Sequence, residues 1–219
     1  WTCFYFDDIN SFSYVSTTDN AKEYYGVEAG LDFKVTSFLN LKFIGTISEA
    51  KYVNDATVRY LNSTQGTYND DILRCTGMRE SGTPLTALSG AISYHQGGWF
   101  IDLNGNYYDR IYLSYSPYYR MDGPLSKINE EPSPQDKGNG GFMLDGSIGK
   151  SIRLKKGQLS INFMVTNILN NTRICTGGYE QSRSDFTSSG NARSYRFSKN
   201  PKKYYAYGTN GMINLSYRF

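Results

Sequence analysis

The carboxy-terminal stretch, Lys203–Phe219, constrains the fold more than any other part of the chain, because its side chains alternate in character. One set is apolar or small: Phe219, Tyr217, Leu215, Ile213, Gly211 and Thr209. The intervening set is mainly polar: Arg218, Ser216, Asn214, Met212 and Asn210. A period of two is typical of a β-strand. Aromatic residues close both ends of the apolar set, as in a strand whose ends meet the headgroup layers of a bilayer.

The composition favours β-structure. The chain has 20 Tyr, 12 Phe and 22 Gly, residue types that favour strands and turns over helices. It contains no run of about 18 apolar residues, so the sequence predicts no transmembrane helix. Its mean hydropathy of −0.53 is typical of a soluble protein, but a β-barrel with a polar lumen has the same low value. The net charge of +3 gives no argument for a nucleic-acid partner.

The same alternation recurs in six earlier segments. They are Tyr24–Val35, Leu41–Glu49, Leu85–Tyr94, Trp99–Leu113, Phe142–Leu154 and Gln158–Leu169. Short turns and long loops alternate between them, the long loops covering residues 53–83, 114–140 and 170–202. Bacterial outer-membrane barrels have short periplasmic turns and long extracellular loops. The sequence therefore predicts an all-β, transmembrane antiparallel β-barrel.

A soluble β-sandwich is the alternative fold. Its dry interior would have to hold one face of each strand, and its loops need not alternate in length. The polar faces here carry Asp32, Asp102, Asp145 and Arg218. Burying these charges in an apolar core is costly, whereas a wet lumen accommodates them. The charges therefore favour the barrel.

The amino-terminal segment Trp1–Phe6 is shorter than the roughly 9–11 residues that a membrane-crossing strand needs. We interpret it as a truncated strand and the chain as the tail of a longer polypeptide. Seven strands and a partial strand cannot close a bacterial barrel, which has an even strand number. A self-standing porin or enzyme barrel of eight strands would require the first strand to be complete.

Five segments resemble a known family when they are taken in order. They are YYGVEAGLDFKVTSFLNLKF at Tyr24–Phe43, NYYDRIYLS at Asn106–Ser114, GGFMLDGSIGKSIRL at Gly140–Leu154, LSINFMVTNILNNTRICTGGYEQSRSDF at Leu159–Phe186 and KKYYAYGTNGMINLSYRF at the end. Their order and spacing resemble the carboxy-terminal part of TonB-dependent outer-membrane transporters, in particular the large receptors of Bacteroidetes. The ending also resembles the signature strand of outer-membrane barrels, with Phe219, Tyr217, Leu215 and Ile213 as the membrane-insertion signature.

The resemblance implies that residues 1–219 form about the last third of a barrel of about 22 strands filled by a plug. It implies a nutrient importer in the cell outer membrane of a Gram-negative bacterium, with outer-membrane lipid around it. The partners would be an inner-membrane TonB complex, acting through an upstream plug, and a nutrient ligand such as an oligosaccharide, peptide or siderophore. The family also allows for a surface lipoprotein that captures the substrate. An adhesin-like barrel without transport is the alternative function.

Two loop segments are candidate ligand contacts. Tyr115, Tyr118, Tyr119 and Arg120 follow the strand that ends near Leu113, and aromatic rings beside a guanidinium suit a sugar or another amphipathic nutrient. The alternative is an interfacial aromatic girdle that continues into the loop, which we prefer for Tyr112. The second segment holds Tyr179, Arg183 and Asp185 after a CTGG stretch at Cys175–Gly178. Its alternative is loop architecture, with glycines supplying positive φ.

The remaining reactive residues predict no catalytic or metal site. Cys3, Cys75 and Cys175 match no zinc spacing, and the sequence leaves open whether any two of them pair. The single histidine, His95, lies in a predicted short turn. Adjacent carboxylates such as Asp70 and Asp71 point apart on an extended strand, which leaves only weak calcium binding open. We predict a protein that is not an enzyme and uses no cofactor.

Overall fold

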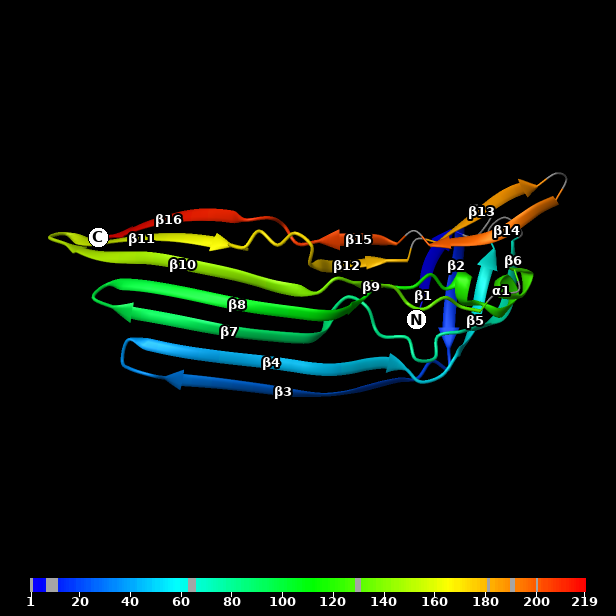
Figure 1. The fold of residues 1–219 in the computed structure, drawn as a ribbon, viewed down its shortest axis with the longest axis horizontal. Helices are drawn as coiled ribbons and strands as arrows, with labels where there is room; N and C mark the ends of the chain where they lie inside the picture. The colour runs from blue at the N-terminus through cyan, green and yellow to red at the C-terminus, as the bar shows by residue number, and fades with distance from the viewer. Residues whose placement is uncertain are drawn as a thin grey trace.

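A computed structural model of the chain describes residues 2–6, 12–62, 66–128, 131–180, 182–189, 192–199 and 201–219. The fold is all-β, and its largest unit is a long antiparallel sheet (Figure 1). The long strands of this sheet, in spatial order, are β3 (Lys22–Lys34), β4 (Leu39–Tyr52), β7 (Pro84–Gln96), β8 (Trp99–Tyr112), β10 (Gly141–Leu154), β11 (Gly157–Thr166) and β16 (Asn210–Arg218). The short strand β9 (Lys137–Gly138) extends the pairing of β8. Six of the seven predicted strands are confirmed, and the seventh is confirmed only from Asn210 onward.

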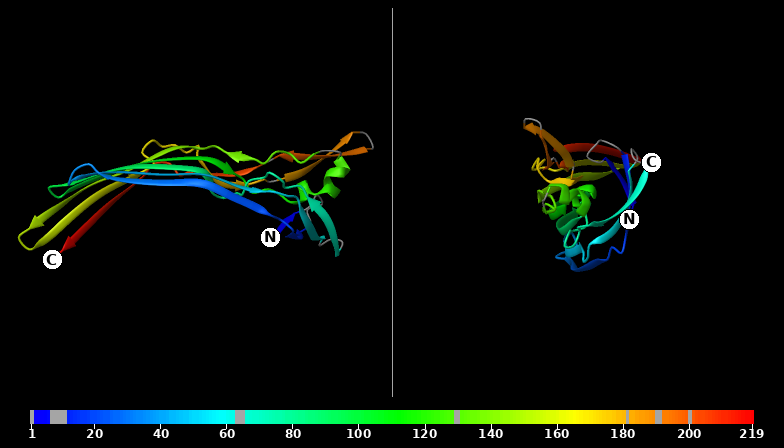
Figure 2. Two further views of the ribbon diagram at one scale, coloured as in Figure 1. Left: turned by 90° about the horizontal axis from the view of Figure 1, so that it is seen from below. Right: turned by 90° about the vertical axis from the view of Figure 1, so that its right-hand side faces the viewer.

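The connections at the two ends of the sheet differ in length. Residues 35–38, 97–98 and 155–156 make short turns at one end, which we call the turn end. The long connections 53–83, 113–140 and 167–209 lie at the other end, which we call the loop end. The views agree that most of the remaining structure lies beyond the loop end, and that the sheet is long and curved (Figure 2).

One face of the sheet is apolar and exposed. The register sets Phe163 opposite Ile213 and Ile161 opposite Leu215, so these side chains lie on the same face. Ile213 is 67% exposed and Leu215 is 68% exposed. Exposed apolar side chains continue on this face across the other strands: Val27, Leu31, Phe43, Ile47, Leu88, Ile92, Ile101, Leu103, Phe142 and Ile148. No described part of the chain covers them.

The opposite face is polar. Asn104 lies opposite Asp145, and Asn162 lies opposite Asn214. The hydroxyls of Ser151 and Ser160 lie 3.1 Å apart on paired strands. This face holds the charged residues that would be costly in a dry core. The long sheet therefore has one apolar face and one polar face, as the alternation predicts.

A second, four-stranded sheet lies at the loop end. Its order is β1 (Thr2–Phe6), β2 (Phe12–Thr18), β5 (Ala56–Asn62) and β6 (Thr67–Leu73). The interpretation of the first residues as a truncated strand of the long sheet is therefore wrong, because β1 pairs with β2 instead. The interpretation of residues 53–83 as a long loop is also wrong in detail, because this segment contains β5 and β6. β5 and β6 form a hairpin of largely polar residues, in which Arg59 of β5 forms an ion pair with Asp70 of β6.

The dry core of the described chain belongs to this second region rather than to the long sheet. It is a cluster of buried residues: Val15, Tyr52, Ala56, Val58, Leu73, Cys75, Met78 and Met121. These residues come from β2, the end of β4, β5, β6 and the segment that follows β6, except Met121, which lies in the connection between β8 and β10. Burying apolar side chains here holds the long connections against the end of the sheet.

The other long connections also contain short elements. Between β8 and β10 lie a 3₁₀ turn, η1 (Tyr118–Arg120), and a short helix, α1 (Asp122–Ile128). After β11 come β12 (Cys175–Tyr179), paired with β15 (Lys202–Tyr205), and β13 (Ser182–Ser189), paired with β14 (Ala192–Lys199). None of the described helices is long and apolar enough to cross a membrane.

The terminal stretch is interrupted, contrary to the single strand predicted from its alternation. Tyr205 belongs to β15 and lies opposite Cys175, while β16 starts only at Asn210. The backbone between them bonds elsewhere: Ala206 N donates to Ile174 O at 2.9 Å, and Thr209 N donates to Asn170 Oδ1 at 3.1 Å. Within the described residues, β3 and β16 are the two edges of an open sheet.

Candidate functional site

A cavity of about 360 Å³ lies at the loop end, between three segments that are far apart in sequence. Residues 74–79 form one wall, residues 132–135 form a second, and Arg120 of η1 contributes to a third. The lining includes Arg74, Arg79, Asp55 and Tyr112. The volume falls at the lower end of the range for small-molecule sites, which is about 300–1,000 Å³.

Of the predicted cluster Tyr112, Tyr115, Tyr118, Tyr119 and Arg120, two members line this cavity, Tyr112 and Arg120. Arg120 is 3% exposed. Its Nη2 donates to Glu180 Oε1 at 2.6 Å, and its Nη1 donates to Ser133 O at 2.8 Å. Its guanidinium carbon lies 5.8 Å from the centre of the Tyr115 ring. Within the described chain its Nε has no hydrogen-bond partner. Arg120 therefore carries one buried N–H, at Nε, that no described group accepts.

The tyrosines of this cluster pack against protein. The rings of Tyr118 and Tyr119 meet edge to face at 5.4 Å, and Tyr118 is buried. The ring of Tyr115 meets that of Tyr52 edge to face at 6.0 Å and packs on the buried cluster. These contacts fix the backbone that presents Arg120. Sequence alone does not distinguish such packing from an open stacking surface.

The structure brings the two predicted ligand segments together. Glu180 N donates to Ser114 O at 2.7 Å, and Ser114 N donates to Gly178 O at 3.1 Å. Glu180 was not among the predicted site residues. It follows Tyr179 directly and binds Arg120, so it connects the second predicted segment to the cavity. Its carboxylate also accepts hydrogen bonds from the backbone amides of Ser116 and Asp136. Tyr179 itself is exposed beside Tyr204. The side chains of Arg183 and Asp185 lie outside the described part of the structure.

Asp55 organises the wall formed by residues 74–76. Its Oδ1 accepts hydrogen bonds from Cys75 N and Thr76 N at 2.9 Å each and from Thr76 Oγ1 at 2.7 Å. Its Oδ2 accepts from Arg74 Nη1 at 3.1 Å. Burial by itself raises the pKa of Asp55, but these donors outweigh burial and hold its pKa below the ordinary value. Asp55 is therefore a fixed anion that shapes the cavity.

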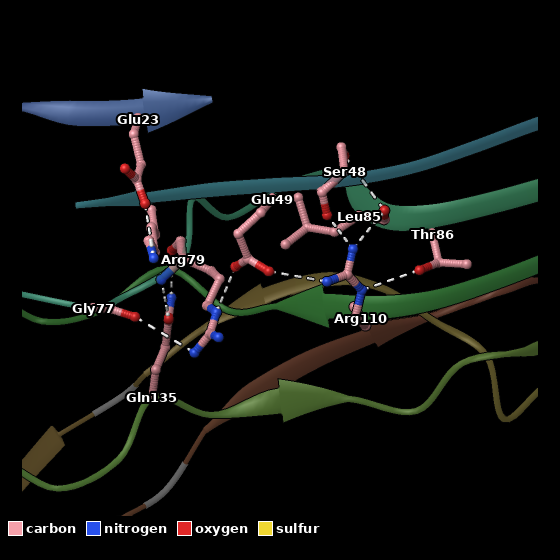
Figure 3. Close-up of polar contacts among 10 residues, drawn as sticks. Glu23, Ser48, Glu49, Gly77, Arg79, Leu85, Thr86, Arg110 and Gln135 are labelled. Atoms are coloured by element: carbon pink, nitrogen blue, oxygen red, sulfur yellow. Dashed lines mark hydrogen bonds and ion pairs between the residues drawn. The ribbon is translucent and has the colours of Figure 1, made fainter. Parts of the chain in front are cut away.

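A charged network borders the cavity at the end of β4 and β8 (Figure 3). Glu49 accepts from Arg79 Nε at 2.7 Å and from Arg110 Nη1 at 3.0 Å. Arg110 has a φ of 55°, and this local reversal directs its other donors to Ser48 O, Leu85 O and Thr86 Oγ1. Gln135 fixes Arg79 through two hydrogen bonds with its backbone. The sequence contains one signal for this network: Glu49 is a charged residue on the face of β4 that is apolar up to Ile47.

The described residues contain no group of three or more His, Cys, Asp or Glu side chains arranged to hold a metal ion. Asp70 pairs with Arg59, and Asp71 Oδ2 accepts from Gly123 N at 2.9 Å. Cys75 and Cys175 are both buried and free, so they do not form the disulfide that the sequence left open.

Comparisons of the chain with protein-family models, with curated proteins and with solved structures found no significant match.

Proposed function

We propose that the chain forms the carboxy-terminal part of an outer-membrane β-barrel of about 22 strands that imports a nutrient by a TonB-dependent route. The observation that carries this proposal is the exposed apolar face of the long sheet. The proposed location is the outer membrane of a Gram-negative bacterium, with the turn end toward the periplasm and the loop end toward the exterior.

The apolar face argues for lipid contact through its extent. Leaving one large aliphatic side chain in water instead of burying it costs about 1.5–3 kcal/mol. Exposed apolar side chains occur on this face in all seven long strands. A contiguous patch of this extent on a soluble monomer marks an interaction surface. Lipid is the partner that fits, because the opposite face is polar and would line a water-filled lumen.

The import part of the proposal rests on the family resemblance and on the cavity at the loop end. In this orientation the cavity faces the exterior side, where a nutrient arrives. Its arginines, Asp55 and the Tyr112 ring are suited to a polar ligand that carries hydroxyl or carboxylate groups. The TonB complex would act through a plug upstream of this chain.

The membrane placement is tested by a pair of neighbouring substitutions in β16. Ile213→Arg puts a charge on the proposed lipid face, which costs about 2–4 kcal/mol near the bilayer centre. Asn214→Arg puts the same charge on the polar face, and we expect it to be tolerated. The measurement is the fraction of full-length protein that assembles in outer-membrane vesicles as a heat-modifiable, protease-resistant barrel. Equal assembly of the two variants would remove the basis of the proposal.

Transport is tested separately in cells that carry or lack a functional TonB complex. Candidate oligosaccharides, peptides and siderophores are screened for uptake that depends on both the full-length protein and TonB. Surface binding without TonB-dependent uptake would favour an adhesin-like barrel instead.

A further inference from the structure

We propose that Arg153, Gln158 and Arg218 form an anion-binding site on the polar face of the long sheet, at its turn end. We call these three residues the arginine row. Its ligand carries two or more carboxylate or phosphate groups. The site lies at the opposite end of the sheet from the cavity, so it goes beyond the proposed import function. Only its position at the periplasmic mouth of the lumen rests on the membrane placement proposed above.

The strand register places the arginine row across three neighbouring strands. Arg153 of β10 lies opposite Gln158 of β11, and Gln158 lies opposite Arg218 of β16. The next residues on this face are Ser151 and Ser160, whose hydroxyls lie 3.1 Å apart, so the row belongs to the polar face. Neighbouring strands lie about 4.8 Å apart, which separates the backbones of the two arginines by about 10 Å. The three strands lie side by side at the turn end (Figure 1).

The side chains of the arginine row have no partner in the described chain. All three residues are exposed. Neither guanidinium forms a hydrogen bond or an ion pair with a described residue. Two other basic side chains of the polar face differ: Lys42 Nζ lies 3.5 Å from Asp32 Oδ2, and His95 Nε2 lies 3.5 Å from Asp102 Oδ1. The arginine row therefore keeps its donors for a ligand.

The sequence around the arginine row is strongly basic. Residues 146–169 contain four Lys or Arg side chains and no Asp or Glu. Two of these cations, Lys155 and Lys156, are exposed in the turn between β10 and β11. The nearest carboxylate on the same face of β10 is Asp145, eight residues from Arg153 and therefore about 26 Å along the strand. Positive charge without compensation attracts anions and raises their local concentration.

The backbone that carries the arginine row is held by the sheet and by one side chain. Tyr217 lies opposite Leu159 on the apolar face, and its hydroxyl donates to Lys156 O in the turn. This contact ties β16 to the turn between β10 and β11. Because the backbone of paired strands needs little ordering when a ligand binds, this arrangement favours affinity.

The arrangement suits a ligand with two anionic groups. A guanidinium presents its donors in a planar fork that matches carboxylate and phosphate oxygens. Two such forks flank the amide of Gln158, which adds donors of its own. Beyond the row, Ser216 and the pair Asn162–Asn214 lie on the same face and offer hydroxyl and amide groups to the uncharged part of the ligand. A ligand with a single anionic group would leave one arginine unused.

The experiment uses the full-length protein in detergent and measures binding by isothermal titration calorimetry at low salt. The probes are succinate, its uncharged diamide and pyrophosphate. The test variant is Arg153→Gln combined with Arg218→Gln. The matched control is Lys34→Gln. Lys34 is also an exposed cation of the polar face at the turn end without a described partner, but it lies on β3, at the opposite edge of the sheet.

We expect the wild type to bind succinate or pyrophosphate but not the diamide, and the tighter anion identifies the groups of the ligand as carboxylates or phosphates. The affinity should fall about fivefold for each arginine removed, the upper range for an exposed ion pair. High salt should weaken binding, because it screens exposed charges. The Lys34 control should bind as the wild type does. No binding of either anion, equal binding of the diamide, or an equal loss in the control would overturn the proposal.

Two further measurements keep the outcomes distinct. If the double variant fails to fold, the single variant Arg153→Gln decides, because Arg153 is exposed and has no hydrogen bond or ion pair with a described residue to lose. Assembly into a bilayer is measured in parallel on the wild type. Failure to assemble rejects the membrane placement, whereas assembly without anion binding rejects only the arginine row as a site.

Discussion

The ring of Phe142 lies across the backbone of Gly105 on the neighbouring strand. A methyl group added to Gly105 would come within 2.7 Å of Phe142 Cζ. The same relationship recurs with Phe43 and Gly90, where the added carbon would lie 3.4 Å from the ring. An aromatic side chain that covers a glycine on the adjacent strand shields its backbone and helps to fix the register. These contacts lie on the proposed lipid face.

We therefore expect Gly105→Val to destabilise the folded protein by about 1–3 kcal/mol, because the ring of Phe142 has to leave its position. Gly30→Val is the matched control, since a side chain added at Gly30 meets no atom within 4 Å. The measurement is the denaturant midpoint of unfolding in detergent. Combining Gly105→Val with Phe142→Ala should recover part of the loss. Additive losses would contradict the proposed contact.

Asn167 joins the end of β11 to β10 and to the segment between β15 and β16, and it is almost fully buried. Its backbone amide donates to Asp145 Oδ1 at 2.7 Å, and its Nδ2 donates to Tyr207 O at 2.8 Å. Its φ of 50° is a conformation that Asn tolerates better than most residues. Asn167→Ala should lower the free energy of unfolding by roughly 2–4 kcal/mol through lost hydrogen bonds and backbone strain.

Asn167→Gly separates the effect of the lost hydrogen bonds from the effect of backbone strain. Glycine relieves the backbone strain but also lacks the amide, so we expect it to be less harmful than alanine by about 1 kcal/mol. Both variants are compared by chemical unfolding. Equal stability of Asn167→Ala and the wild type would show that the amide contacts do not contribute.

Asp55→Ala should expose the backbone amides of Cys75 and Thr76 to exchange. Each hydrogen bond to a charged acceptor contributes about 1.5–3 kcal/mol, so exchange at these amides should accelerate by at least about tenfold. Native-state hydrogen exchange measures this effect. Asp71→Ala is the control, because its carboxylate contacts Ile72 N and Gly123 N instead.

Hydrogen exchange at the backbone amides of Cys75 and Thr76 should also depend on pH, with protection lost at acidic pH. Hydrogen bonds hold the folded pKa of Asp55 below its ordinary value of 3.8, so its stabilisation is present at neutral pH. Protection is lost only as the pH falls through the folded pKa. Loss of protection already near pH 6 would contradict the assignment.

Cys75 should be a poor nucleophile in the folded protein. Burial, together with the nearby charge of Asp55, raises the pKa of its thiol to about 11. In a Cys3→Ser, Cys175→Ser background, alkylation by iodoacetamide at pH 8 should be slow and should accelerate toward pH 11, because the thiolate is the reactive form. Denaturation should remove the protection at once. Rapid labelling of folded protein at pH 8 would argue against this burial.

The Arg120–Glu180 pair should hold the loop end together. Both side chains are nearly buried, so Glu180→Gln leaves a buried cation without its charge partner, a change that costs about 3–5 kcal/mol. We expect faster proteolysis of the segments around Ser114 and Ser133. The double variant Arg120→Met, Glu180→Leu should be less sensitive than Glu180→Gln alone. If Glu180→Gln is as resistant as the wild type, the pair has no such role.

The sequence by itself determined the long sheet and the character of its faces. Alternation with a period of two is a local property, since successive side chains of a strand point to opposite sides whatever lies beside it. The strand positions, the order of short turns and long loops, and the exposure of Ile213 and Leu215 followed from this pattern. Arg120 was likewise identifiable as a loop cation beside aromatic residues.

Only the tertiary structure decided what the long connections do. Pairing of β1 and β2 with β5 and β6 joins segments that are distant in sequence, and local periodicity carries no information about such partners. The break between Tyr205 and Asn210 depends on acceptors at Ile174 and Asn170. The cavity and the charged network around Glu49 arise in the same way, because Glu180 and Glu49 acquire their roles only from the arginines that the fold places beside them.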